Sequence, residues 1–266
     1  MIATHQSVKW RIVLRDLIRQ FFFRAYAQLS IKSVSPALLM SVLSINSYAN
    51  TEIEELRPRI GQEWVQVQND KRQNIRAYIR HEEHKRYRSF KADIILETNI
   101  KTLANVLLDF NNYTKWYWKA SNAQRLKKVS HTHFILYIVH DVPYNLPDLD
   151  VILDATIEPQ SLTKPYITIK VAALPNHLPL KPPLQRMMAE DMSIRITPIA
   201  NNKVYMEVHG YFEAPNNVLP TWAANMIQRT APYTVLSQLK KMTNQTHYQQ
   251  DNTPIGFPVY EYDELP

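Results

Sequence analysis

Apolar side chains occupy every second position in two neighbouring segments near the C-terminal end of the chain, residues 192–198 and 204–212. A period of two is typical of β-strands that bury one face. The Asn201-Asn202 pair lies between the segments, and asparagine tolerates the positive φ angles that tight turns require. The pattern therefore predicts a β-hairpin.

After this hairpin the apolar spacing changes to that of an α-helix. We expect the helix to begin near Pro220, because proline suits the first helical turn. Asn216 or Asn217 is in position to cap it. A sheet would thus lead directly onto a long helix that packs across it, either filling the core or covering a cavity.

Pro232 divides the apolar residues of this helix into two sets. The first set is Leu219, Trp222, Ala223, Met226 and Ile227, and the second is Val235, Leu236, Leu239 and Met242. The two sets fall on nearly opposite faces of a straight helix. Proline removes a backbone donor and clashes with the preceding turn, so we predict a kink or break near Thr230-Ala231. Trp222 and Met226 would then lie over the cavity.

The rest of the chain predicts further strands and one more helix. Strands are expected at residues 64–68, 74–80, 89–97, 134–139, 151–158 and 167–172. Residues 103–110 have helical spacing, and Asn99 is the natural cap of that helix. The proline-rich run 175–183 cannot donate a regular ladder of hydrogen bonds and is expected to form a loop. This order predicts an α+β fold.

The pattern divides the chain into a leader, one domain and a tail. Residues 50–245 are expected to form one domain, because no glycine-rich or serine-rich linker and no internal repeat divides them. Residues 246–266 are polar, then rich in proline and acidic side chains, without periodicity. They predict a poorly ordered tail.

The leader, residues 1–49, has a basic region followed by a short apolar segment at 35–49 that ends in Ser47-Tyr48-Ala49. Ser47 and Ala49 place small residues at the two positions that a signal peptidase recognises, so we predict an exported protein, periplasmic or secreted, cleaved near Ala49. The alternative is a retained membrane-associated segment. In that hypothesis residues 8–29 form a basic amphipathic helix lying on a membrane.

Charge and composition exclude several classes of function. The leader carries six basic residues and one acidic residue, so of the net charge of +7 only +2 remains for the rest of the chain. That balance gives no reason to expect a nucleic-acid partner. The three glycines are isolated, which argues against a phosphate-binding loop. The absence of cysteine excludes thiolate metal sites, iron–sulfur clusters and a cysteine nucleophile.

The polar candidates for chemistry are weak. His81 and His84 are three residues apart, whereas the zinc-protease motif needs two histidines four apart on a helix, so a charged turn is expected there. His131, His133 and His140 lack a nearby carboxylate at ligand spacing, and Ser193 lacks recognisable triad partners. We therefore expect no metal, no cofactor and no catalytic residue.

Several short segments follow one another in a specific order. They are Trp64, the strand at 90–97, the helix at 103–116 with Asp109 and Trp116, the Val142-Pro143…Asp150 segment, and Leu219-Pro220-Thr221-Trp222-Ala223-Ala224-Asn225 at the start of the last helix. Together they resemble the START family, the steroidogenic acute regulatory protein-related lipid transfer domains of the helix-grip (SRPBCC) superfamily. The resemblance implies a curved antiparallel sheet wrapped around a long C-terminal helix, and an internal apolar cavity that binds or transfers a lipid without catalysis.

The expected partner is accordingly one lipid or similar hydrophobic molecule, with transient contact to a membrane. The residues expected to line its site are Leu136, Leu153, Ile169, Ile194, Met206, Trp222, Met226 and Ile227. Two hypotheses stay open beside this one. The first is a cyclase-like enzyme of the same superfamily, which a buried, paired histidine or carboxylate in the cavity would favour. The second is an envelope interaction protein with a fully packed core.

Two positions depart from the family pattern. Family members often carry an Arg-Asp pair where this chain has Leu149-Asp150, which removes a possible buried charge partner, so no salt bridge is carried over from the resemblance. Members also carry a glycine before the final helix where this chain has Asn216-Asn217. The second change is sterically mild, because asparagine also adopts the left-handed backbone conformation.

Overall fold

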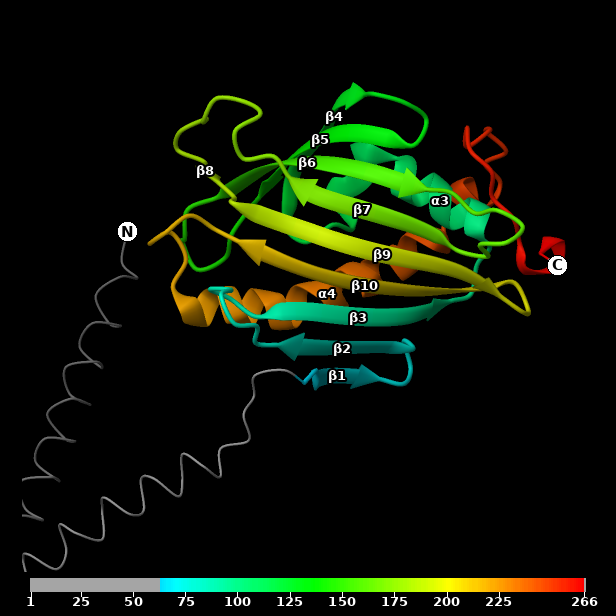
Figure 1. Ribbon diagram of the computed structural model, residues 1–266, viewed down its shortest axis with the longest axis horizontal. Coiled ribbons are helices and arrows are strands. Elements are labelled where there is room, and N and C mark those ends of the chain that lie inside the picture. The colour runs from blue at the N-terminus through cyan, green and yellow to red at the C-terminus, as the bar shows by residue number, and fades with distance from the viewer. Residues whose placement is uncertain (1–62, 266) are drawn as a thin grey trace, which may run out of the picture. The chain divides into compact units, whose positions relative to one another are not determined.

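The computed structural model describes residues 63–265, and Figure 1 shows their arrangement. Ten strands form one sheet in the order β1-β2-β3-β10-β9-β7-β6-β5-β4, with β8 paired to β6. The strands are β1 (Val65–Asp70), β2 (Ile75–Arg80), β3 (Ser89–Leu96), β4 (Ala120–Lys128), β5 (His133–His140), β6 (Leu149–Glu158), β7 (Ile167–Ala173), β8 (Gln185–Arg186), β9 (Ala189–Ile199) and β10 (Lys203–Glu213). The pairs are antiparallel, except that β8 runs parallel to β6. The predicted leader, its cleavage site and the alternative membrane-surface helix lie outside the described residues.

The predicted hairpin is confirmed as β9 and β10. Lys203 pairs with Ile199, and the turn residues Asn201 and Asn202 have φ angles of 66° and 53°. Strands are also present at the six other predicted positions. β4 was missed, because this edge strand of lysine, arginine and polar residues exposes most of its side chains and shows no apolar alternation.

The helices are α3 (Ile100–Leu108), α4 (Thr221–Thr243) and α5 (Thr246–Gln249), with 3₁₀ turns η1 (Phe110–Lys115) and η2 (Tyr262–Glu264). The predicted cap of the first helix is confirmed. Asn99 precedes α3 in an extended conformation, and its side-chain oxygen accepts a hydrogen bond from the Thr102 backbone N–H at 2.7 Å. This bond satisfies one of the N–H groups that a helix leaves free at its N-terminus.

α4 differs from its prediction in two ways. Its N-cap is Pro220, whereas Asn216 and Asn217 lie in the preceding turn, so the predicted cap is wrong. The helix also continues without a break from Thr221 to Thr243, with Pro232 inside it.

The buried stripe of α4 explains why no break is needed. It advances by three or four residues through Ala224, Gln228, Pro232, Leu236 and Leu239, and so stays on one side of the helix. Alanine, glutamine and proline are not strongly hydrophobic, so the pattern of hydrophobic residues did not reveal this stripe. It indicated two opposed faces instead. The helix lies along one face of the sheet, against β2 and β3 (Figure 1).

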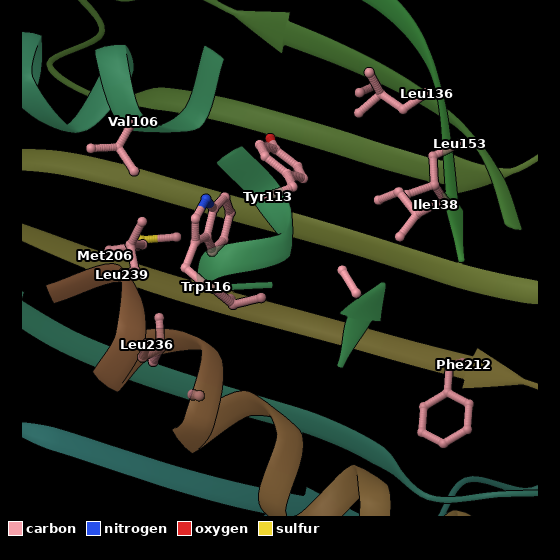
Figure 2. Packing of buried hydrophobic residues seen from close by; sticks show 14 of the residues in the cluster. Val106, Tyr113, Trp116, Leu136, Ile138, Leu153, Met206, Phe212, Leu236 and Leu239 are labelled. Carbon is pink, nitrogen blue, oxygen red and sulfur yellow. The ribbon is translucent and has the colours of Figure 1, made fainter. Parts of the chain in front are cut away.

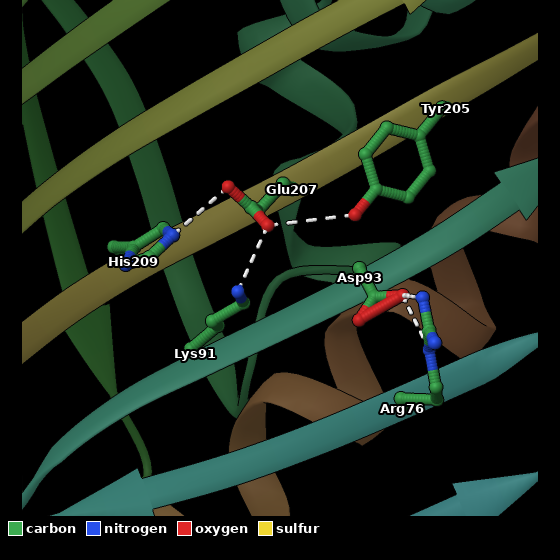
Figure 3. A network of polar contacts seen from close by, with 6 residues as sticks. All are labelled: Arg76, Lys91, Asp93, Tyr205, Glu207 and His209. Carbon is green, nitrogen blue, oxygen red and sulfur yellow. Dashed lines mark hydrogen bonds and ion pairs between the residues drawn. The ribbon is translucent and has the colours of Figure 1, made fainter. Parts of the chain in front are cut away.

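The hydrophobic core lies between the inner face of the sheet and the helices. Figure 2 shows side chains from α3, η1, the strands and α4 pointing toward one another. Leu136, Ile138 and Leu153 come from the strands, and Leu236 and Leu239 come from α4; all are at least 95% buried. The opposite face of the sheet carries charged side chains. There Arg76 pairs with Asp93, and Glu207 contacts Lys91 and His209 (Figure 3).

A second, smaller cluster lies on the other face and is covered by the proline-rich loop. Ile135, Tyr137, Val139 and Ile152 pack there against Leu174, Leu178 and Leu184. The loop is tied down by an ion pair. Arg186 donates two hydrogen bonds of 2.9 Å to the Asp150 carboxylate and others to the backbone carbonyls of Pro175 and Leu178.

Asp150 therefore has a buried charge partner, although Leu149 stands where family members often carry arginine. The partner, Arg186, comes from β8, 36 residues away in the sequence, so no local pattern announces it. The pair lies under the loop on the outer face, and neither residue lines a cavity.

The segment after Gln245 also differs from the expected disordered tail. Glu261 accepts hydrogen bonds from the first backbone N–H groups of α3, those of Ile100 and Lys101, at 3.1 and 3.2 Å. The Gln160 side chain and the Tyr260 backbone exchange two hydrogen bonds of 3.0 and 2.9 Å. These long-range contacts hold a segment that has no periodicity of its own, and we call residues 246–265 the strap. Within residues 63–265, no helix is long and apolar enough to cross a membrane.

Candidate ligand cavity

Two cavities lie between the inner face of the sheet and the helices. The first, about 90 Å³, is here called the His140 cavity. It is lined by Phe90, Ala92, Leu149, Met187, Tyr211, Phe212 and other apolar groups of the sheet, by Ile227, Gln228 and Ala231 of α4, and by Tyr117, Trp118, His140 and Glu190. Polar groups are few and gather at one place in this lining.

The second cavity, about 110 Å³, is here called the Phe257 cavity. Its lining comes from α3, η1, the inner face of β5, β6, β7, β9 and β10, and from Phe257 of the strap. It contains no charged side chain. Two polar atoms of its aromatic residues are buried there: the Tyr113 hydroxyl donates to the Leu107 carbonyl at 2.7 Å, whereas the Trp116 indole N–H has no hydrogen-bond partner in the described part of the chain.

The two cavities adjoin, because five residues line both. They are Tyr117, Met192, Val208, Val235 and Leu236. Side chains, rather than a layer of backbone, therefore separate the two spaces. Rotation of flexible side chains such as Met192 and Leu236 would join them into one longer cavity.

A missing side chain shapes the His140 cavity. Gly210 of β10 occupies an inward-facing position, between Val208 and Phe212. A Cβ atom there would overlap the Phe90 ring and come within 2.9 Å of the Met192 Cγ atom. Because glycine has no Cβ atom, the side chains of Phe90 and Met192 can lie close to the β10 backbone at this boundary of the cavity.

Five of the eight residues expected to bind ligand line the Phe257 cavity: Leu136, Leu153, Ile169, Ile194 and Met206. Ile227 lines the His140 cavity. Trp222 and Met226 line neither, because they lie off the buried stripe of α4. Trp222 is 59% exposed and contacts the Tyr144 ring, and the Tyr144 hydroxyl lies 3.5 Å from the Met226 sulfur. The prediction that these two residues cover the cavity is wrong.

Three polar residues that the sequence prediction missed meet in the His140 cavity. Glu190 lies at an inward-facing position of β9, and His140 ends β5 on the same side as Leu136 and Ile138. Tyr117 follows η1. The alternation along β5 would have turned His140 inward, but nothing local indicates that Glu190, fifty residues later, would lie beside it.

The three side chains form one connected group. The Tyr117 hydroxyl donates to the Glu190 Oε1 atom. The His140 Nε2 atom lies 3.3 Å from Glu190 Oε2, a charge contact without the angles of a hydrogen bond. On the other side of the imidazole, Nδ1 lies 2.8 Å from the Trp118 carbonyl oxygen, which can only accept, so Nδ1 is the donor. The His140 side chain is 4% exposed and the Glu190 side chain 10%.

The environment of this group shifts the pKa values of His140 and Tyr117. Burial alone would lower the pKa of His140, but the Glu190 carboxylate and the bond to Trp118 outweigh it and raise the pKa above 6.5. Burial, together with the negative charge of Glu190, raises the pKa of the Tyr117 hydroxyl well above 10. An imidazole, a carboxyl group and a phenol thus meet at one place in an otherwise apolar lining.

The structure offers no comparable metal centre. Among residues 63–265 no three histidine or acidic side chains gather as a metal site would require. His81 and His84 lie in the turn between β2 and β3. In that turn Glu82 pairs with Lys85 and Arg80, which lowers the pKa of Glu82 to about 2. The predicted charged turn is confirmed.

Comparisons with known proteins identify solved structures that share this fold. No family model and no curated protein sequence matches the chain. Among solved structures, the STAR-related lipid transfer protein (fragment 25–204) from Xanthomonas axonopodis matches with a TM-score of 0.63 and 23% identity over 69% of this chain and 100% of that one. Human STARD10 matches with a TM-score of 0.59 and 15% identity over 82% of each chain. Human StAR-related lipid transfer protein 5 gives 0.59 and 12%, over 78% of this chain and 98% of that one. The chain thus has the START-like helix-grip fold, as the resemblance predicted.

Proposed function

We propose that the protein binds one hydrophobic molecule between its sheet and α4 and carries it, without changing it, in the manner of a lipid-transfer protein. The observation that supports this most is the pair of adjoining cavities inside the core, lined almost entirely by apolar side chains. Enclosed apolar cavities with a few polar groups are typical ligand sites. The fold that the chain shares with proteins named for lipid transfer agrees with this proposal.

The size of the cavities limits the ligand. Sites for drug-sized molecules usually measure about 300–1,000 Å³, whereas these measure about 90 and 110 Å³. A ligand would therefore occupy both, displacing the side chains that separate them. Uptake and release of a ligand that fills both cavities also require part of the covering structure to move.

We propose that the start of α4 contacts a membrane when the ligand is exchanged. Trp222 is 59% exposed and Tyr144 64%, and their rings lie 5.9 Å apart in a T-shaped arrangement. Exposed tryptophan and tyrosine side chains are the ones that partition to the interface of a bilayer. Trp222→Ala should slow transfer between vesicles while leaving equilibrium binding unchanged.

Binding inside the core can be tested with two neighbouring residues of β6. Ala155 lines the Phe257 cavity, whereas Thr156 points to the other face of the sheet. Ala155→Phe should reduce binding of a fluorescent lipid at least tenfold, because the ring fills the cavity, and Thr156→Phe should not. Equal binding by both folded variants would contradict an internal site.

The second candidate is a cyclase-like enzyme acting on a hydrophobic substrate. The buried group of Tyr117, Glu190 and His140 favours it, because paired titratable side chains in a cavity are suited to proton transfer. Incubation with extracted lipids, followed by mass spectrometry, distinguishes the two. A carrier returns its ligand with unchanged mass, whereas an enzyme yields a product that Glu190→Gln abolishes.

We also propose export, with the chain from Asn50 onward, which includes the strap, as the mature protein. The proposal is motivated by the Ser47-Tyr48-Ala49 sequence after the apolar segment. N-terminal sequencing of protein from its native cell should then find Asn50 or a close neighbour. An intact Met1 on a protein in the cytoplasmic fraction would exclude export.

A further inference from the structure

Positive charge is concentrated along one edge of the sheet. β4 is this edge strand (Figure 1), and the segment around it, residues 110–140, contains five basic side chains and no acidic one. All five are exposed, and none forms an ion pair with another residue of the range 63–265. We call this surface the basic edge; its cations are Lys115, Lys119, Arg125, Lys127 and Lys128.

The basic edge differs in charge from the rest of the domain. The chain after the leader has a net charge of +2, of which residues 110–140 supply +5, so the remainder carries −3. On the outer face of the sheet cations have acidic partners, as Lys91 has in Glu207. A molecule with this separation of charge turns its basic edge toward an anionic surface, because its other faces are repelled.

Protection of the sheet edge explains only part of this pattern. Lysines and β-bulges keep an edge strand from pairing with another chain, and β4 has both, with irregular register at residues 120–122 and 125–127. Exposed apolar side chains add nothing to such protection. Yet Leu126 lies between two of the cations and is 38% exposed, and Val129 follows two lysines and is 47% exposed.

Cations mixed with apolar side chains are suited to the interface of an anionic bilayer. Lysine and arginine attract the lipid phosphate groups, and side chains such as Leu126 and Val129 can enter the boundary between head groups and acyl chains. A strand from another protein is disfavoured, because the bulges and lysines oppose pairing at this edge. Nucleic acid is disfavoured too, because β4 contains no aromatic side chain on which bases could stack.

The basic edge also lies beside the strap. His131 belongs to the turn after β4, and a Cβ atom at Gly256 of the strap would overlap its imidazole ring. The next residue of the strap, Phe257, lines the second cavity. A bilayer on the basic edge would therefore meet the molecule next to the strap that bounds the Phe257 cavity.

We propose that the basic edge docks on a membrane containing anionic phospholipids, with its cations against the phosphate groups and Leu126 and Val129 in the interface. This contact is electrostatic, whereas the one proposed for Trp222 and Tyr144 is aromatic. It goes beyond the proposed function, because it does not depend on whether the cavities hold a ligand. It determines which edge of the sheet faces the bilayer.

Vesicle co-sedimentation of the full chain tests the docking surface. Lys127→Gln/Lys128→Gln should bind vesicles that contain phosphatidylglycerol about tenfold more weakly, because each lysine near an anionic bilayer adds to the attraction. The matched control is Lys71→Gln/Arg72→Gln, which removes the same charge from exposed positions after β1, at the opposite edge of the sheet. It should change binding less than about twofold, because charges far from the bilayer are screened. The leader is identical in both variants, so its basic residues do not affect the comparison.

A fluorescent label tests whether the apolar side chains enter the interface. The chain contains no cysteine, so Val129→Cys provides a single site for the environment-sensitive dye NBD. Its emission should rise and shift to the blue on vesicles that contain phosphatidylglycerol. The same dye on Ser193→Cys, at an exposed outer position of β9, should respond little.

Several outcomes would overturn this inference. Equal weakening in the two charge variants would show a response to net charge alone, and unchanged binding of Lys127→Gln/Lys128→Gln would place the contact elsewhere. Equal dye responses at the two labelled positions would exclude insertion at the basic edge. Tighter binding of polyglutamate or single-stranded RNA than of vesicles, lost in the same lysine variant, would assign the edge to another class of partner. None of these results alters lipid binding inside the cavities, so the proposed function would still stand.

Discussion

The His140 cavity and the Phe257 cavity adjoin but are built differently. The first contains the buried contact between His140 and Glu190, whereas the second is lined by aliphatic and aromatic side chains and bounded by the strap. A polar group enclosed in an apolar wall costs stability unless something satisfies it, whereas apolar lining contributes stability wherever it packs. The two cavities therefore affect stability differently, because the first depends on the contact between His140 and Glu190 and the second on apolar packing.

Removing the charge partner of Glu190 should have the largest effect. His140→Ala leaves a buried carboxylate without its cation, and we expect the free energy of unfolding to fall by about 3–5 kcal/mol in urea titrations. His133→Ala, on the same strand but on the outer face and half-exposed beside Asp154, should cost less than about 1 kcal/mol. Equal losses of stability in the two variants would show that Glu190 does not depend on His140 as a buried charge partner.

Removing a side chain that separates the two cavities should have the second-largest effect on stability. Leu236→Ala removes a shared side chain, so we expect a loss of about 2–5 kcal/mol in the free energy of unfolding and a shift of binding toward longer hydrophobic ligands. Leu239→Ala is the control, because Leu239 is as deeply buried on α4 but lines neither cavity. It should cost similar stability without changing the preferred length. The same length preference in both variants would argue against a joined cavity.

Stability should also depend on pH through His140. Its pKa is raised in the folded protein above the ordinary 6.5, so its contribution is complete below pH 6.5 and is lost as the pH rises through the folded value. Each unit of raised pKa corresponds to about 1.4 kcal/mol. In Glu190→Gln the carboxylate is gone and burial lowers the pKa of His140, so this contribution should increase with pH instead. Urea titrations from pH 5 to 9 that give parallel profiles for the two proteins would contradict the charge pairing.

A substitution in the strap should have the smallest effect on stability. Glu261→Gln removes a negative charge from the N-terminus of α3, and we expect a loss of about 0.5–1 kcal/mol, with faster hydrogen exchange in residues 246–265. Asp263→Asn, an exposed change in η2, should alter neither. Unchanged exchange in the Glu261 variant would show that other contacts hold the strap beside the Phe257 cavity.

Local signals in the sequence predicted most of the fold. The β9–β10 hairpin and the cap of α3 depend on residues close together in the chain, Asn201, Asn202 and Asn99, and both are confirmed. α4 was placed correctly but its face was misjudged, because the buried stripe uses Ala224 and Gln228 while Trp222 remains exposed. Hydrophobicity of single residues does not show which side of a helix the sheet will cover.

The candidate site was only half predictable for the same reason. Alternation along strands identified the apolar lining, including Leu136, Leu153 and Met206. The polar group depends on contacts between distant segments, since Tyr117, His140 and Glu190 come from three different parts of the chain. The Arg186–Asp150 pair was missed in the same way. Such pairings follow from the register of the sheet, which no short pattern specifies.

Native mass spectrometry of the full chain, purified from its own cells without detergent, tests the central claim most directly. The account predicts a single added mass per chain, released on unfolding and identified as one hydrophobic molecule. Ala155→Phe should lose this mass and Thr156→Phe should keep it, because only the first side chain enters the Phe257 cavity. A folded protein that carries no added mass, and takes none up from a total lipid extract, would contradict the account.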